Sequence, residues 1–74
     1  MHVLVREVDP KLVGRRVEVK LRPRGGASVT SAIHGILADV GEDFVVIRTE
    51  RNKLVTIPRI NIQTVDVVAG EDLS

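Results

Sequence analysis

The strongest constraint on the fold is the alternation of apolar and charged residues between Arg15 and Arg22. In an extended chain Val17, Val19 and Leu21 point to one side, and the charged side chains between them point to the other. A period of two is typical of a strand with one buried face. We therefore expect a strand here whose valine face belongs to a hydrophobic core.

Four further segments have the composition of strands, because they are rich in Val, Ile and Leu and are separated by turn residues. The first of them carries Gly35 in its middle, where a glycine lets a strand bend sharply. We expect an all-β fold, a small five-stranded, strongly bent antiparallel SH3-like barrel over residues 9–68. The four segments are 29–40, 44–50, 54–57 and 60–68.

A very short helical turn is expected ahead of the first strand. Asp9 can cap it, Pro10 suits its first position, and Gly14 can end it. Leu12 and Val13 would then close one end of the core.

The remaining ends of the chain flank this barrel. We expect residues 1–8 to form an N-terminal arm or an extra strand, and the polar residues 69–74 to form a disordered tail.

The size of the chain points to a single small domain. A domain of 74 residues buries a modest share of its surface and often depends on disulfides, metals or oligomerisation. It has no cysteine, and His2 and His34 alone cannot form a zinc site. Self-association is therefore a candidate source of stability. No segment is long and apolar enough to span a membrane, so we expect a cytoplasmic protein.

The titratable residues do not assemble into a catalytic site. His34 and Asp39 are five residues apart and face opposite ways on an ideal strand, so we expect His34 to be structural or exposed to solvent. Glu42 and Asp43 lie in a turn, where acidic residues are common for conformational reasons. We expect a protein that is not an enzyme and that holds no cofactor or metal.

A basic cluster leaves two interpretations open. It would form either a solvated strand face, tempered by Glu18, or a salt-sensitive stripe that contacts phosphates. The net charge of +1 and the single aromatic residue, Phe44, argue against a strongly cationic or aromatic platform for nucleic acid. The cluster comprises Arg16, Lys20, Arg22 and Arg24.

The order of the expected elements resembles the Sm-like (LSm) family, which includes archaeal Sm-like proteins and bacterial Hfq. The first motif of that family is matched by "HGIL" and "DFVV", where Leu37 follows Gly35 by two positions and Phe44 follows it by nine. The second motif is matched in "IPRINI" by Ile57, Asn61 and Ile62. The resemblance covers residues 9–68.

The sequence departs from the family at positions that bind RNA. Gly41 and Val45 stand where the family has an aspartate and an asparagine that help to hold uracil, and Pro58-Arg59 replaces an Arg-Gly pair. Arg59 could meet RNA near the pore of a ring or form a salt bridge between subunits with Asp39, Glu42 or Asp43. Asn61 suits a structural role better than reading a base. The RNA-contacting residues that the resemblance implies are Arg59, Asn61, Asp43 and Phe44.

The resemblance also implies a homo-oligomeric ring, a hexamer or heptamer, that binds RNA such as U-rich or A-rich single strands in RNA processing or as a chaperone. Its subunits would join through the segments 54–57 and 60–68. The alternative is an Sm-like or SH3-like barrel that binds or scaffolds other proteins without binding RNA. The expected interface residues are Leu54, Val55, Ile57, Ile60 and Ile62.

Overall fold

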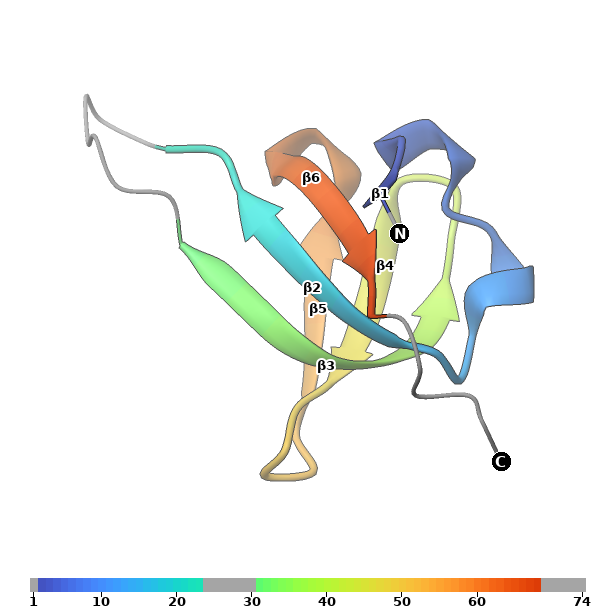
Figure 1. Cartoon of the computed structure of the whole chain (residues 1–74), viewed down its shortest axis with the longest axis vertical. Coiled ribbons are helices and arrows are strands. Elements are labelled where there is room, and N and C mark those ends of the chain that lie inside the picture. The colour runs from blue at the N-terminus through green and yellow to red at the C-terminus, as the bar shows by residue number, and fades with distance from the viewer. Residues whose placement is uncertain (1, 24–30, 69–74) are drawn as a thin grey trace.

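The computed structural model describes residues 2–23 and 31–68, which form one antiparallel sheet (Figure 1). The sheet has the strand order β1-β6-β2-β3-β4-β5. Three single 3-10 turns accompany it: η1 (Val5–Glu7), η2 (Pro10–Leu12) and η3 (Arg59–Asn61). The strands are β1 (His2–Val3), β2 (Arg16–Leu21), β3 (Ala32–Val40), β4 (Phe44–Arg48), β5 (Leu54–Pro58) and β6 (Ile62–Val67).

The all-β class and the antiparallel pairing are confirmed, but the expectation of a five-stranded barrel is wrong. The sheet has six strands and is open, since β5 pairs only with β4 and β6 pairs with β1 and β2. One reason is that Pro58, which has no backbone N–H, ends β5, and the turn η3 then separates β5 from β6. The two strands do not pair with each other in the described sheet. The sixth strand, β1, adds to β6 through the pairs His2↔Asp66 and Val3↔Val65.

The sheet bends strongly, and β3 curves along its whole length (Figure 1). A Cβ atom at Gly35 would overlap the carbonyl oxygen of Arg48 and lie 2.7 Å from Cγ2 of Ile47. Glycine is therefore required here because the backbone of β4 approaches β3 too closely for a side chain. The ladder between β3 and β4 also shifts register between Leu37 and Asp39.

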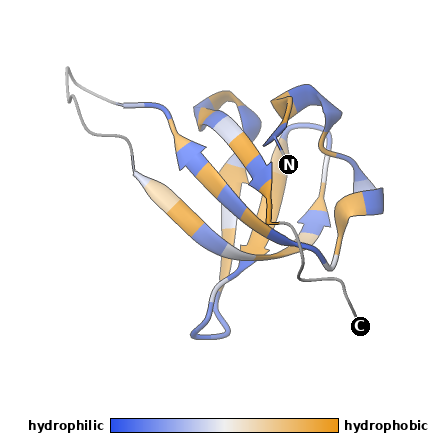
Figure 2. Cartoon of the chain, in the orientation of Figure 1, coloured by the Kyte–Doolittle hydropathy of each residue, from blue (hydrophilic) through white to orange (hydrophobic). Residues whose placement is uncertain are grey.

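The core lies on the concave side of this bent sheet. Apolar and polar bands alternate along β2 and β6 in Figure 2, as expected for strands that bury one face. Ile47 is fully buried, and Val17 and Val19 are each 1% exposed, which confirms the expected valine face of β2. The other buried core residues are Val8, Leu37, Val45, Ile57, Ile62, Val65 and Val67.

The N-terminal turn forms as a single 3-10 turn. The Asp9 carboxylate accepts a hydrogen bond of 3.0 Å from the Lys11 backbone N–H, and Pro10 takes the first helical position. Gly14 has a φ of 95°, which favours glycine. Leu12 packs against the core as expected, but the expectation for Val13 is wrong, because Val13 is 43% exposed.

Some expectations fall outside the described residues, namely Arg24 and the tail 69–74. Within the described part of the chain, no helix has the length and apolar character needed to cross a membrane.

Candidate functional site

Two segments distant in sequence form one corner of the molecule. The first segment is residues 41–44, which comprise the turn before β4 and the first residue of that strand. The second segment is residues 58–61, which comprise the last residue of β5 and the turn η3. We call the two segments together the corner. The Arg59 backbone N–H donates a 2.8 Å hydrogen bond to the carbonyl oxygen of Asp43, and Phe44 pairs with Pro58 across the β4–β5 ladder. The structure thus brings Asp43, Phe44 and Arg59 together. Asn61 ends η3, and its carbonyl oxygen accepts a 2.9 Å hydrogen bond from the Arg22 backbone N–H.

The Arg59 side chain is part-buried and points its guanidinium into the chain's own backbone. Its Nη1 donates to the Val5 carbonyl oxygen at 2.7 Å, and Nη2 donates to the Val8 and Gly41 carbonyl oxygens, each at 2.8 Å. Nε donates to the Gly41 oxygen at 3.2 Å. Arg59 therefore joins η1, the turn before β4 and η3. These bonds hold the corner in place, whereas contact of Arg59 with RNA or with a carboxylate of another subunit stays a prediction.

The corner also presents polar and aromatic groups to solvent. Phe44 is 37% exposed, and its ring lies directly on Gly41, where an added Cβ would overlap the ring. Asp43 and Asn61 are exposed. A hollow opens beside Gly41 and Asp43, and its charged lining consists of Arg6, Asp9, Glu42, Asp43 and Arg59.

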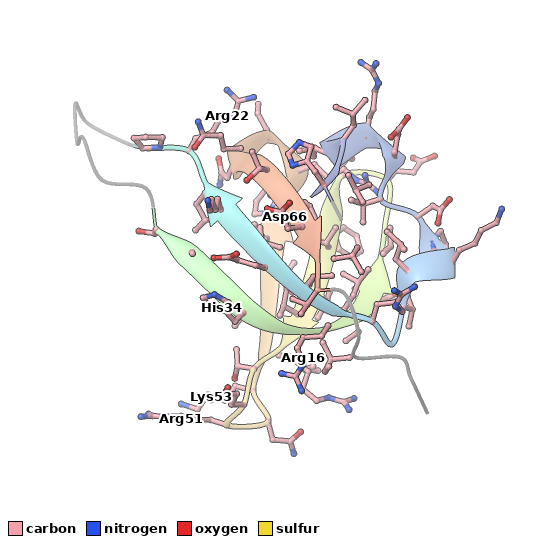
Figure 3. All side chains as sticks on the ribbon, in the orientation of Figure 1. Arg16, Arg22, His34, Arg51, Lys53 and Asp66 are labelled. Carbon is pink, nitrogen blue, oxygen red and sulfur yellow. The ribbon has the colours of Figure 1, made fainter. Side chains whose placement is uncertain are left out.

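The expected basic row on β2 is interrupted at its centre. Arg16 and Arg22 lie at opposite ends of this strand (Figure 3), and Glu18 lies between Arg16 and Lys20 on the same face. Glu18 is also directly opposite Asp66 in the β2–β6 register. One carboxylate in the row and a second beside it on β6 therefore reduce the positive charge at the middle of the row.

Each of the two carboxylates is close to a histidine. Nε2 of His34 lies 3.1 Å from Oε2 of Glu18, and Nδ1 of His2 lies 3.3 Å from Oδ1 of Asp66. The His34 side chain is 63% exposed, as expected for a residue facing solvent. These exposed contacts contribute little to stability. Within residues 2–23 and 31–68, no three histidine or acidic side chains gather closely enough to hold a metal ion.

The expected interface residues divide into two groups. Leu54 and Ile60 are 64% and 79% exposed, and Val55 is half-buried. Ile57 and Ile62, in contrast, are 4% and 1% exposed and belong to this chain's own core. Only the first group can offer apolar side chains to another molecule.

Sequence reasoning missed how Arg59 is used and which carboxylates meet the histidines. Gly41 lies three residues before Phe44, and this spacing could have indicated that the aromatic ring packs on the glycine. No local sequence pattern indicates which carbonyl oxygens surround Arg59. Comparison with known proteins found no matching family model, no matching curated protein and no matching solved structure.

Proposed function

We propose that this chain is a self-associating Sm-like domain that binds single-stranded RNA at the corner. The observation that carries the proposal is the placement of the exposed Asp43 and Phe44 on a corner that Arg59 fixes in place, with the exposed Asn61 at the end of η3. Such a site needs an exposed aromatic ring for stacking and polar groups that can meet the edge of a base.

Phe44 supplies the stacking surface. Its ring lies against Gly41, and its partial exposure leaves ring surface for a base. Stacking of one base on an aromatic side chain contributes about 1–3 kcal/mol and tolerates different bases. The Asp43 carboxylate can accept hydrogen bonds from a base, and the Asn61 amide can both donate and accept.

Self-association would repeat this corner around a ring of six or seven chains. The support for it is β5, an edge strand of the described sheet with the exposed Leu54 on it and Ile60 just beyond it. An exposed edge strand can accept a strand from another chain, and head-to-tail addition closes a ring when the rotation permits. Several copies of the corner in one ring would bind an RNA strand with higher avidity than a single, weakly binding copy.

The proposal is tested by titrating fluorescently labelled U-rich and A-rich oligoribonucleotides and recording anisotropy at several salt concentrations. Phe44→Leu keeps an apolar side chain but removes the ring, and should weaken binding about tenfold or more. Asp43→Asn tests the carboxylate, and Glu50→Gln is its matched control, because it removes an exposed charge from the turn between β4 and β5, outside the corner.

We expect Glu50→Gln to bind RNA as the unmodified chain does, while Phe44→Leu and Asp43→Asn bind less. Circular dichroism should show that all three variants remain folded. Unchanged affinity in both Phe44→Leu and Asp43→Asn, or no RNA binding at low salt, would contradict the proposal.

A second candidate function is a protein-interaction module that does not bind RNA. The exposed Leu54 and Ile60 beside the open β5 edge favour it, together with the net charge of only +1. A chain that self-associates in light scattering but retains no RNA at low salt would support this second function over the first.

A further inference from the structure

The turn between β4 and β5, residues 49–53, is held by its own hydrogen bonds. The Thr49 backbone N–H donates a 2.9 Å bond to the Lys53 carbonyl oxygen, and the Asn52 N–H donates a 2.8 Å bond to the Thr49 carbonyl oxygen. The Lys53 N–H also donates to the Thr49 hydroxyl oxygen at 3.4 Å. Asn52 has a φ of 63°, a left-handed conformation that asparagine adopts more readily than most residues. These contacts fix the turn where it protrudes from the lower end of the sheet in Figure 1.

Three cationic side chains lie at this turn without a partner. Arg48, Arg51 and Lys53 are exposed, and none of their side chains forms a hydrogen bond or an ion pair within the described part of the chain. Residues 48–53 contain a single carboxylate, Glu50, which is also exposed. Positive charge therefore exceeds negative charge at this end of the molecule.

Apolar side chains flank one of these cations. The ladder registers place Arg48 directly opposite Ile36 on one side and Leu54 on the other, and directly opposed residues point to the same face of a sheet. Because the next residue, Ile47, is fully buried, this face points away from the core. Leu54 is 64% exposed and Ile36 is half-buried. The Arg48 charge thus lies between two apolar side chains that another molecule can contact.

A hollow lies beside this row, between β3 and the turn. Its lining consists of His34, Thr49, Glu50 and Arg51. His34 precedes Ile36 by two positions on β3 and therefore shares its face. Figure 3 shows His34, Arg51 and Lys53 toward one end of the molecule and Arg22 toward the other. We call the row and the turn together the basic face; it comprises His34, Ile36, Arg48, Arg51, Lys53 and Leu54.

The basic face is poorly suited to single-stranded RNA. Phe44 is the only aromatic residue of the chain, and it begins β4 at the corner, whereas Arg48 ends that strand. The His34 imidazole lies 3.1 Å from a Glu18 carboxylate oxygen, and that negative charge disfavours a phosphate beside the ring. RNA carries a phosphate at every nucleotide, but a peptide can place an uncharged side chain at such a position.

We propose that the basic face binds an acidic segment of a partner protein. Carboxylates of that segment contact Arg48, Arg51 and Lys53, and an apolar side chain of the same segment packs on Ile36 and Leu54. Opposite charges give such a contact its specificity and speed of association, and the apolar contact adds affinity. The inference does not depend on RNA binding at the corner, because the basic face lies at the other end of β4 and β5.

Fluorescein-labelled synthetic peptides test the proposal by anisotropy on the full chain at several salt concentrations. One peptide repeats Asp-Asp-Leu, and the second repeats Asp-Asp-Ser, which keeps the charge but removes the apolar side chain. A labelled oligouridine is the nucleic-acid probe.

Two protein variants with the same net charge separate this face from the charge of the whole chain. The turn variant is Arg51→Gln with Lys53→Gln. The control variant is Lys11→Gln with Arg22→Gln, which removes two exposed cations outside the basic face. Circular dichroism should show that both variants remain folded.

We expect the unmodified chain to bind the Asp-Asp-Leu peptide with an affinity that falls as salt is added. The turn variant should bind it about fivefold or more weakly, because two exposed charge contacts are lost. The Asp-Asp-Ser peptide should bind about threefold or more weakly than the leucine peptide, because serine buries less apolar surface. The control variant and Phe44→Leu should both bind the leucine peptide as the unmodified chain does, so failure of the RNA site leaves this result unchanged.

Absence of peptide binding at low salt would overturn the proposal. Equal losses in the turn and control variants would also overturn it, because attraction to the net charge would then explain the binding. Equal affinity for the two peptides would contradict the apolar contact on Ile36 and Leu54. A turn variant that loses oligouridine but keeps the leucine peptide would identify the basic face as an RNA contact and refute the assignment to a protein partner.

Discussion

Replacing Arg59 with lysine is the sharpest test of how the corner is held together. The guanidinium reaches three carbonyl oxygens, those of Val5, Val8 and Gly41, at 2.7–2.8 Å in its shortest bonds. Lysine keeps the positive charge, but its donors radiate from one nitrogen, whereas arginine spreads its donors over a planar fork. A lysine at this position can therefore satisfy about one of the three carbonyls.

The magnitude follows from the number of carbonyls that lose a partner. A hydrogen bond to a charged group contributes about 1.5–3 kcal/mol and a neutral one about 0.5–1.5 kcal/mol. The site is only part-buried, so water can replace some of each bond, and we use about 1 kcal/mol per carbonyl. Arg59→Ala should then cost about 3 kcal/mol and Arg59→Lys about 2 kcal/mol of the free energy of unfolding. For a domain of 74 residues, whose total stability is roughly 4–11 kcal/mol, either loss is large.

Urea unfolding followed by far-ultraviolet circular dichroism measures this loss, since the chain has neither tryptophan nor tyrosine. Amide hydrogen exchange provides a local readout, because η1 should open more often once Arg59 releases the Val5 and Val8 carbonyls. Arg51→Lys is the matched control. Arg51 is exposed in the β4–β5 turn, so this variant should stay within about 0.5 kcal/mol of the unmodified chain.

The reasoning is refuted if Arg59→Lys unfolds at the same urea concentration as the control and η1 keeps its protection from exchange. An Arg59→Lys variant with unchanged stability that no longer binds RNA would be equally decisive. It would restore Arg59 to the RNA-contacting role that the sequence suggested.

Three further predictions concern the sheet. Gly35→Ala should lower the free energy of unfolding by about 3 kcal/mol in a urea titration, because its Cβ would overlap the Arg48 carbonyl oxygen; an unchanged midpoint would show that β3 and β4 can separate cheaply. Leu54→Glu should leave the stability of the monomer within about 0.5 kcal/mol but abolish assembly in light scattering, because Leu54 is exposed on the β5 edge; assembly of this variant at the normal concentration would exclude that edge as the contact. Thr64→Val should stabilise the monomer by about 1 kcal/mol in thermal unfolding, because it removes a buried hydroxyl without a partner; a loss of stability would mean that the hydroxyl is satisfied in solution.

Local patterns in the sequence were sufficient for much of the fold. The alternation around Val17 and Val19 predicted a strand and its buried face, and both are observed. Asp9 and Pro10 predicted the helical turn η2, and its cap forms as expected. These features could be predicted because each depends on a residue and its neighbours within a few positions of the same segment.

Local patterns could not predict which strands pair with each other or which segments pack together. The apolar segments predicted a barrel of five strands, yet β6 pairs with β1 and β2 in an open sheet of six strands in the described part of the chain. Val13 was expected in the core from its apolar side chain alone, but it is exposed, because burial depends on what packs over η2.

At the corner, too, local features could be predicted from the sequence, but contacts between distant segments could not. The sequence by itself determined that a proline and an arginine separate two strands, and that Phe44 is the only aromatic residue. Only the tertiary structure decided that Arg59 binds carbonyl oxygens 54, 51 and 18 positions away, and that β1 covers part of β6. The physical reason is that a backbone carbonyl is present at every residue and carries no sequence signal. Which carbonyls reach a guanidinium is therefore fixed by the register and bend of the whole sheet.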